Sequence, residues 1–448
     1  MSPFLSPDRS PVRTVIRELR GFLILWLTQS FSSLGSSMTN FALIVWSYQQ
    51  QGSALTTALL SVCSYAPYVA MSIFAGALSD KWNKKATLLI CDTAAAACTV
   101  AVLVLLQTGL LRIGHLYALN AVNGLMNTVQ QPAADVTISL LTPKKHYQKV
   151  SGLRSLSSSL VSMLTPALAT ALLTLSGLPS VILFDLFTFA AAFVTLLCGI
   201  RIPAAAVDGG PRESVWQSAK GGLRYLRQNR GILHLMLFLA GINLIASLYN
   251  AALPAMLLSK EGGGQAALGI VESVSGIALL LGSAAASLLP PPKSRVRVIC
   301  NSLLLAMSTE NFFLALGGSV PVWAVGALLG WIGIPLMNAN MDVLFRSTIP
   351  LAMQGRVYAA RNTLQFFTIP VGYFLGGFLV DSVMEPFMAS QAAGSGLLPA
   401  LFGRGKGSGA ALLFFFLAVA GTALCLLFRR DRHIWRLEQE EREERPET

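Results

Sequence analysis

The sequence predicts an all-α membrane protein with twelve transmembrane helices in two six-helix bundles and both termini in the cytoplasm. Three observations support this fold class. Of the 448 residues, 54% are hydrophobic and only 12% are charged, whereas an average soluble domain carries about 25% charged residues. Apolar segments long enough to cross a bilayer recur along the chain, and the basic residues between them gather on one side.

Each apolar segment has about the 20 residues that a helix needs to cross the hydrocarbon core. The predicted spans are residues 21–48, 54–79, 86–108, 114–141, 152–177, 180–200, 231–259, 266–289, 298–317, 320–345, 357–381 and 410–428. A polar, arginine-containing stretch separates the first six from the last six. The predicted organisation is a cytoplasmic segment at 1–20, a bundle at 21–200, a central loop at 201–230, a second bundle at 231–428 and a tail at 429–448.

The basic residues predict the orientation. With the N-terminus inside, all but four of the 33 Lys and Arg residues face the cytoplasm, the exceptions being Arg112, Lys260, Arg404 and Lys406. This positive-inside pattern predicts a multi-pass protein of the plasma (inner) membrane. The net charge of +12 then faces anionic lipid head groups, so that no nucleic-acid partner is needed to explain it.

The connection between the second and third spans, GALSDKWNKKATL, places one acid among several bases. A carboxylate here can pair with nearby cations and with the positive end of a neighbouring helix. We expect Gly76, Asp80, Lys81, Lys84 and Lys85 to form a gating loop that holds the two bundles together in one state and releases them in the other. The alternative is a basic loop that only orients the chain.

The two halves of the chain repeat. At an offset of 207 residues, Asp135, Val136, Pro143, Val150 and Arg154 match Asp342, Val343, Pro350, Val357 and Arg361. Duplicated halves are an architecture of transporters, in which a pathway runs between two bundles. The expected partners of the gating loop are Asp135, Arg154, Asp342, Arg356 and Arg361.

The loop resembles the signature of the major facilitator superfamily: Gly76, Asp80 and Lys85 match it, Lys84 keeps a charge, and Lys81 replaces an arginine. Phrases in both halves, among them FDLFTFAAA and GLRYLRQNRGI, are similar to the branch that contains macrolide efflux proteins and the enterobactin exporter. The resemblance implies the major facilitator fold. It further implies a secondary transporter, expected to be an antiporter for proton-coupled efflux of amphipathic drug-, macrolide- or siderophore-like molecules, as in multidrug resistance.

Acidic residues inside spans are costly and mark candidate functional sites. The candidate proton or charge sites are Asp92, Asp185, Glu272 and Glu310. Asp92 could instead pair with Arg154 as a structural bridge, and Asp185 and Glu272 lie near external ends where water could hydrate them. Glu310 has the fewest obvious partners, but the resemblance implies that its span is peripheral, which argues against a place in the cavity.

Polar side chains recur at helical spacing in the first, fourth and seventh spans, so each set lies on one helix face. The candidate cavity residues are Gln29, Phe31, Ser33, Ser36, Asn40, Asn120, Asn123, Asn127, Gln130, Asn243, Ser247, Asn250 and Asn338. The resemblance implies that spans 1, 4, 7 and 10 line a central cavity; the alternative is hydrogen bonding between helices, worth about 0.6 kcal/mol per contact. With aromatic rings such as Trp46, Tyr249 and Trp331, this lining predicts an amphipathic, largely neutral solute.

No sequence pattern supports an enzyme, a metal site or a cofactor, and without an ATP-binding motif the proton gradient is the natural energy source. The expected partners are an amphipathic substrate, protons and lipids, and the expected state is a monomer. Residues 385–409 are predicted to be a flexible external loop, and the tail a solvated, partly helical extension. The alternatives are an importer or facilitator of a polar nutrient, or a membrane sensor or scaffold that transports nothing.

Overall fold

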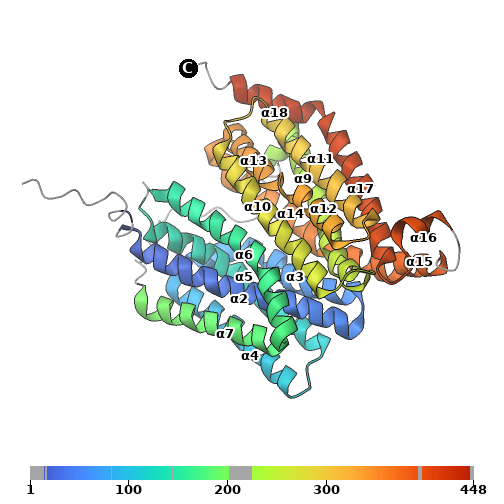
Figure 1. The fold of residues 1–448 in the computed structure, drawn as a ribbon. Helices are drawn as coiled ribbons and strands as arrows, with labels where there is room; N and C mark the ends of the chain where they lie inside the picture. The colour runs from blue at the N-terminus through green and yellow to red at the C-terminus, as the bar shows by residue number, and fades with distance from the viewer. Residues whose placement is uncertain are drawn as a thin grey trace, which may run out of the picture.

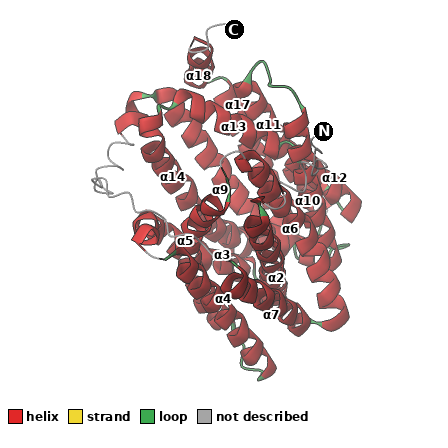
Figure 2. Ribbon diagram, turned by 90° about the vertical axis from the view of Figure 1, so that its left-hand side faces the viewer, coloured by secondary structure: helices red, strands yellow, loops and turns green. Residues whose placement is uncertain are grey.

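The computed structural model describes most of the chain. Described are residues 15, 18–81, 83–143, 146–200, 224–391 and 396–443, without the side chains of 72–81, 148, 346, 351–356, 358–364, 366 and 439–443. All regular secondary structure in these residues is helical (Figure 2). The all-α prediction is therefore confirmed for the part of the chain that the structure describes.

The first half forms six long helices whose ends fall within a few residues of the predicted spans. They are α2 (Arg20–Gln51), α3 (Ala54–Lys81), α4 (Lys84–Gln107), α5 (Ile113–Leu141), α6 (Tyr147–Ser176) and α7 (Leu178–Val194), which continues into the π-helical η2 (Thr195–Gly199). Local sequence explains the breaks between them. Gly52 ends α2 with a left-handed backbone (φ 61°), which glycine adopts without strain. The Asn83 side chain accepts a hydrogen bond from the backbone N–H of Ala86 and so caps the start of α4.

The second half is more subdivided. Its elements are α9 (Arg230–Ser259), α10 (Gln265–Leu288), α11 (Arg295–Leu316), α12 (Val320–Trp331), α13 (Ile334–Thr348), α14 (Leu351–Leu379), η3 (Val380–Met384), α15 (Glu385–Gln391), α16 (Leu397–Phe402), α17 (Ser408–Arg429) and α18 (Arg432–Glu443). The predicted tenth span is split into α12 and α13 just before Pro335. Proline has no N–H to donate and favours the first turn of a helix, so it starts a new helix here.

Ten helical segments in the described part are long and apolar enough to cross a membrane. Two further long helices, α2 with 32 residues and α5 with 29, are long enough to cross a membrane but are less apolar than these ten. These are two of the three helices on which the sequence shows polar stripes, and those side chains lower their mean hydropathy. Twelve spans therefore remain a prediction.

The helices form two groups, α2–α7 and α9–α18, that meet at one end and diverge toward the other (Figure 1). We name the end with α15 and α16 the α15 face, and the opposite end, with α18, the α18 face. The groups contact each other chiefly through α3 against α14 and α6 against α10. A Cβ atom on Gly377 of α14 would lie 2.6 Å from the Leu55 Cα of α3, so a small residue is needed for this close approach.

The predicted flexible loop at 385–409 is largely helical, which corrects that expectation. It contains α15 and α16, and residues 392–395 lie outside the described part. Glu385 Oε1 accepts hydrogen bonds from the backbone N–H groups of Gly407 (2.8 Å) and Ala410 (3.4 Å) at the start of α17. Met388 and Phe402 are buried. A carboxylate at a helix N-terminus and two buried apolar anchors order this segment.

The tail is helical as predicted, but it is docked rather than solvated. Helix α18 packs on α9, α11 and α13 and buries Ile434 and Leu437, which lie three residues apart on one face. The Glu438 carboxylate accepts from Ser294 Oγ (2.8 Å) and from the backbone N–H of Arg295 (3.1 Å). The tail thus caps the start of α11.

Lys260, just beyond α9 at the α15 face, is partly buried. Its Nζ donates to the carbonyl of Gly317 at 3.0 Å and lies 5.8 Å from the centre of the Trp323 ring. Burial lowers the pKa of Lys260 from 10.5 to about 8, because the charged form loses hydration. Folding therefore disfavours the charged lysine.

A pH dependence of stability follows from this pKa. Between about pH 8 and 10.5 the unfolded chain binds more protons than the folded one, so stability rises with pH in this window. We expect thermal unfolding of the purified protein to show a gain on the order of 1–2 kcal/mol from Lys260, after allowance for solvent screening. The Lys260→Met variant should lack this component; identical pH profiles for the two proteins would contradict the assignment.

Candidate functional site

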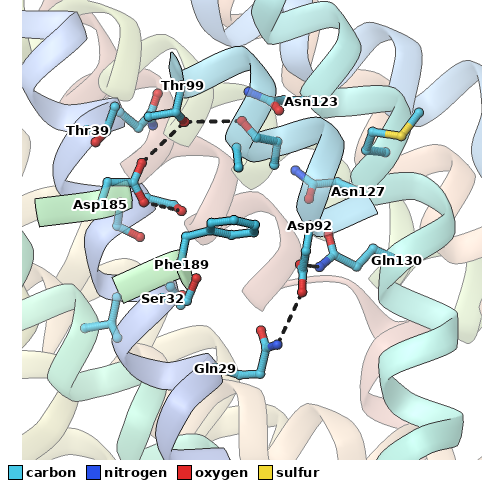
Figure 3. A pocket seen from close by; sticks show the side chains of 18 of the residues that line it. Gln29, Ser32, Thr39, Asp92, Thr99, Asn123, Asn127, Gln130, Asp185 and Phe189 are labelled. Carbon is cyan, nitrogen blue, oxygen red and sulfur yellow. Dashed lines mark hydrogen bonds between the residues drawn. The ribbon is translucent and has the colours of Figure 1, made fainter. Parts of the chain in front are cut away.

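A cavity of about 870 Å³ lies inside the first bundle, and its described lining comes from α2 to α7 (Figure 3). Eight of the predicted cavity residues line it: Gln29, Ser33, Ser36 and Asn40 of α2, and Asn120, Asn123, Asn127 and Gln130 of α5. Each set recurs at steps of three and four residues, which places its members on one helix face. The two polar stripes thus face the same cavity.

The other five predicted cavity residues do not line this cavity. Phe31 is 52% exposed, because it lies two residues from both Gln29 and Ser33 and so points to the opposite side of α2. Asn243, Ser247, Asn250 and Asn338 belong to the second bundle, and Asn250 and Asn338 are exposed.

Ser247 shows why the polar set of α9 behaves differently. Ser247 is buried and donates to the carbonyl of Asn243 in its own helix at 2.8 Å. A Cβ on Gly372 of α14 would lie 2.5 Å from the Ser247 Cβ. Ser247 therefore packs against α14 and does not line the cavity, whereas a cavity role for Asn243 and Asn250 remains a prediction. Tyr249, expected among the cavity aromatics, is buried too.

Asp92 of α4 is held by two amides at the cavity wall. Its Oδ1 accepts from Gln130 Nε2 at 2.6 Å and its Oδ2 from Gln29 Nε2 at 3.4 Å. The alternative of a structural bridge from Asp92 to Arg154 is wrong, because Arg154 Nη2 pairs with Asp135 Oδ1 at 2.8 Å. Both residues of that pair were expected as partners of the gating loop, and here they bind each other.

Asp185 of α7 is 3% exposed, so the expectation of a hydrated carboxylate near a helix end is wrong. Its Oδ1 accepts from Ser36 Oγ at 2.9 Å, and its Oδ2 from Thr99 Oγ1 at 3.5 Å. A Cβ on Gly35 of α2 would lie 2.9 Å from the Asp185 Cα. The missing side chain at Gly35 lets α7 approach α2 closely and brings the carboxylate into the bundle.

The two carboxyl groups occupy different ends of the cavity. Thr99, which contacts Asp185, lies seven residues after Asp92 on α4, a rise of roughly 10 Å. Figure 3 shows Phe189 between the two acids. Among the described residues neither acid forms an ion pair, so both are held by neutral donors only.

Glu310 has more partners than the sequence suggests, and the expectation of few partners is wrong. It is 6% exposed, and its Oε1 accepts from Tyr249 Oη at 2.5 Å and from Trp331 Nε1 at 2.9 Å. These donors come from α9 and α12, whereas Glu310 lies on α11. The carboxyl group therefore links three helices of the second bundle and lies away from the cavity.

Glu272 lies on the face of α10 that packs against α6. Gly269 and Gly276, three residues before and four after it, approach Thr170 and Met163 of α6. Glu272 is partly buried, and none of the hydrogen bonds within the described residues involves it. The side chain is thus placed at the contact between the two bundles, outside the cavity lining.

The gating loop can be placed only in part. Gly76, Asp80, Lys81, Arg356 and Arg361 lie in stretches whose side chains are outside the described residues. Lys85 Nζ donates to the carbonyls of Leu197 and Ile200, both at 2.8 Å, which caps the end of η2 within the same bundle. Lys84 is buried and Asp342 is exposed. Lys85 therefore stabilises the first bundle in this state, and a latch between bundles remains a prediction for the others.

Asp381 joins the two bundles at the α15 face, a role that sequence reasoning missed. Its carboxylate, on η3, accepts from Ser53 Oγ (2.6 Å) and from the backbone N–H groups of Ala54 (3.0 Å) and Leu55 (2.9 Å). These groups form the first turn of α3, where a negative charge is favourable. A serine directly before an apolar segment signals a helix start, but nothing local points to an acid more than 300 residues away.

Comparison with known proteins agrees with this architecture. The family model of the Major Facilitator Superfamily matches residues 25–373. The chain is 21% identical over 368 residues to macrolide efflux protein A of Streptococcus pyogenes, covering 81% of this chain and 90% of that protein. It is 25% identical over 333 residues to an enterobactin exporter of Citrobacter koseri, covering 72% and 76%.

Among solved structures, a bacterial homologue of the human lysosomal transporter Spinster, in an inward-facing and unoccupied conformation, superposes with a TM-score of 0.65 at 14% identity, covering 98% of this chain and all of that one. This likeness shows the shared fold. The family model spans most of the described helices, including all six of the cavity-bearing bundle. The chain therefore belongs to the major facilitator superfamily, whose members are membrane transporters and not enzymes.

Proposed function

We propose that the protein is a secondary active exporter, which moves amphipathic small molecules out of the cytoplasm by alternating access and uses the proton gradient. The observation that supports this most is the cavity of about 870 Å³ with two carboxyl groups and no ion pair to them among the described residues. Relatives that export macrolides and enterobactin, by their names, support the direction of transport.

The arrangement of the bundles fits the loading state of an exporter. The distribution of basic residues predicts that the α18 face is cytoplasmic. Asp381 and the helix pairs α3–α14 and α6–α10 join the bundles toward the opposite face, and the helices diverge toward the α18 face (Figure 1). With that orientation, substrate enters from the cytoplasm and leaves after the contacts at the α15 face open.

We place the coupling site at Asp92. Its hydrogen bonds come from two amides, so it can gain or lose a proton without breaking an ion pair. Asp92 is partly exposed whereas Asp185 is almost fully buried, and therefore water reaches Asp92 more easily. Binding a proton from outside and releasing it inside would drive the return of the empty carrier.

The test is an efflux measurement in cells that lack their own pumps. Cells expressing the protein and preloaded with a fluorescent amphipathic dye should lose the dye, and an uncoupler should stop this. Asp92→Asn should lower uphill efflux to about a tenth or less, as expected when a proton-transfer group is lost, with Glu261→Gln in an exposed loop as the control. Efflux that survives the uncoupler but stops on ATP depletion would refute proton coupling.

A second measurement tests whether the protein imports its substrate instead of exporting it. Uptake of labelled sugars or amino acids into vesicles, without efflux of any dye, would indicate an importer of polar nutrients instead. The amide-lined wall of α5 is compatible with such a solute, so both dye efflux and nutrient uptake need to be measured.

A further inference from the structure

The cavity contains a buried carboxyl group, Asp185, and a buried amide oxygen that has no partner in the part of the chain that the structure describes. Figure 3 places Thr39, Thr99, Asn123 and Asp185 together at one end of the cavity. Asn123 Oδ1 is buried and has no hydrogen-bond partner among the described residues, and the Thr39 side chain hydrogen-bonds to the Asp185 carboxyl group; both residues line the cavity. Thr39 is only 6% exposed. Leaving a buried polar atom unpaired costs about 1–3 kcal/mol, which favours a ligand that donates to Asn123 Oδ1.

The charges of the cavity wall also favour a ligand that donates hydrogen bonds. Arg154 is the one basic residue among the described lining residues, and it pairs with Asp135. Asp92 and Asp185 therefore face the cavity without a compensating cation among the described residues. A carboxylate in a low-dielectric site is strongly unfavourable unless it is protonated or paired. A positive charge on the ligand can supply that pairing.

We infer that the cavity binds amphipathic organic cations, with a protonated amine paired to Asp185 and the unpaired Asn123 Oδ1 as a further acceptor in the same cavity. An ammonium group has three donors and no acceptor, which suits a carboxyl group without a cation partner among the described residues and an unpaired amide oxygen. Phe189, which also lines the cavity, offers an aromatic face to the amine and its neighbouring carbons. This replaces the largely neutral solute expected from the sequence.

The inference names the substrate class of the proposed exporter and rests on that function for its physiological meaning. Binding can be measured without a proton gradient, so the inference about binding and the proposal about export can fail independently. The purified protein is tested with three probes that share a naphthylethyl body: 2-(1-naphthyl)ethylamine, 2-(1-naphthyl)ethanol and 3-(1-naphthyl)propanoic acid. Their charges at neutral pH are positive, zero and negative. Ligand-induced thermal stabilisation reports binding, because a ligand of the native state raises its apparent stability.

The expected order is amine first, alcohol much weaker and acid undetectable. Asp185→Asn keeps the volume and can still accept from Ser36 and Thr99, so folding should persist. It should weaken amine binding by about tenfold or more, the loss typical of one partner of a buried charge pair, and leave the alcohol unchanged. Asp185→Glu should restore part of the amine affinity, because it restores the charge.

The matched control is Glu310→Gln, which removes a buried carboxyl from the other bundle, away from the cavity. It should leave the preference for the amine intact. Equal binding of all three probes, or an amine affinity that Asp185→Asn does not change, would overturn the inference even if dye efflux is proton-driven. Cation-selective binding by a protein that shows no efflux would support the binding site and contradict the proposed export function.

Discussion

Replacing Asp381 with alanine is expected to open the protein at the α15 face. The carboxylate spans the two bundles and accepts three hydrogen bonds from the first turn of α3. Its loss should cost the closed state about 1.5–3 kcal/mol, or roughly 10- to 150-fold in the balance of the two states. Ser53 still caps α3, because its Oγ accepts from the backbone N–H of Thr56 at 3.0 Å. The variant should therefore fold.

The opening can be measured with a single cysteine at Ser61, which lines the cavity on α3. In a background without the six native cysteines, a membrane-impermeant maleimide added at the α15 face should label Asp381→Ala faster than the parent protein. Asp381→Asn should show an intermediate rate, since one amide oxygen still accepts.

Glu385→Gln is the matched control for this experiment. Glu385 also holds a helix N-terminus, but that of α17 within its own bundle. Its substitution should affect local stability and leave the labelling rate unchanged. If both variants label at the parental rate, the bundles are held at this face by helix packing such as that at Gly377, and the Asp381 contact does not set the balance.

The second large effect is expected at Glu310, and it concerns stability. Glu310→Ala leaves the Tyr249 hydroxyl and the Trp331 N–H without their acceptor inside the second bundle. Two unpaired buried donors and the lost side-chain volume should lower stability by about 2–4 kcal/mol, allowing for the weaker hydrogen bonds measured in membrane proteins. Thermal unfolding of the purified protein should show this as a marked fall in melting temperature.

Companion variants separate the hydrogen bonds from the volume. Glu310→Gln retains an oxygen that can accept from both donors and should lose less than about 1 kcal/mol. In the Glu310→Ala, Tyr249→Phe double variant the orphaned hydroxyl is gone, so the total loss should be smaller than the sum of the single losses. Equal melting temperatures for Glu310→Ala and Glu310→Gln would show that the network contributes nothing.

Features that depend on local composition were predictable from the sequence. Hydropathy places the helix ends because a bilayer requires a certain length of apolar residues. Helical spacing places Gln29 with Ser36, and Asn123 with Gln130, on the cavity face, because a face is a property of one helix alone. The same reasoning excludes Phe31, whose position two residues from Gln29 and Ser33 could have shown that it faces away.

Features that depend on which helices meet could not be predicted in this way. The spacing of Asn243, Ser247 and Asn250 also defines one face of α9, but only the packing of α9 against α14 decides that Ser247 faces a glycine and not a cavity. The partners of Glu310 come from two other helices. Asp381 and Ser53 are separated by 328 residues, so their pairing is invisible without the fold.

The polarity of α2 and α5 also affects how the protein is made. α2 is the earliest long helix among the described residues, and it is less apolar than the ten later segments that could cross a membrane. Polar residues raise the free energy of passage from the translocon into lipid. Some of its polar side chains find partners on helices made later, such as Asp92 for Gln29 and Asp185 for Ser36. We therefore expect stable insertion of α2 to depend on α4 and α7, and variants that lose those acids to reach lower levels in the membrane.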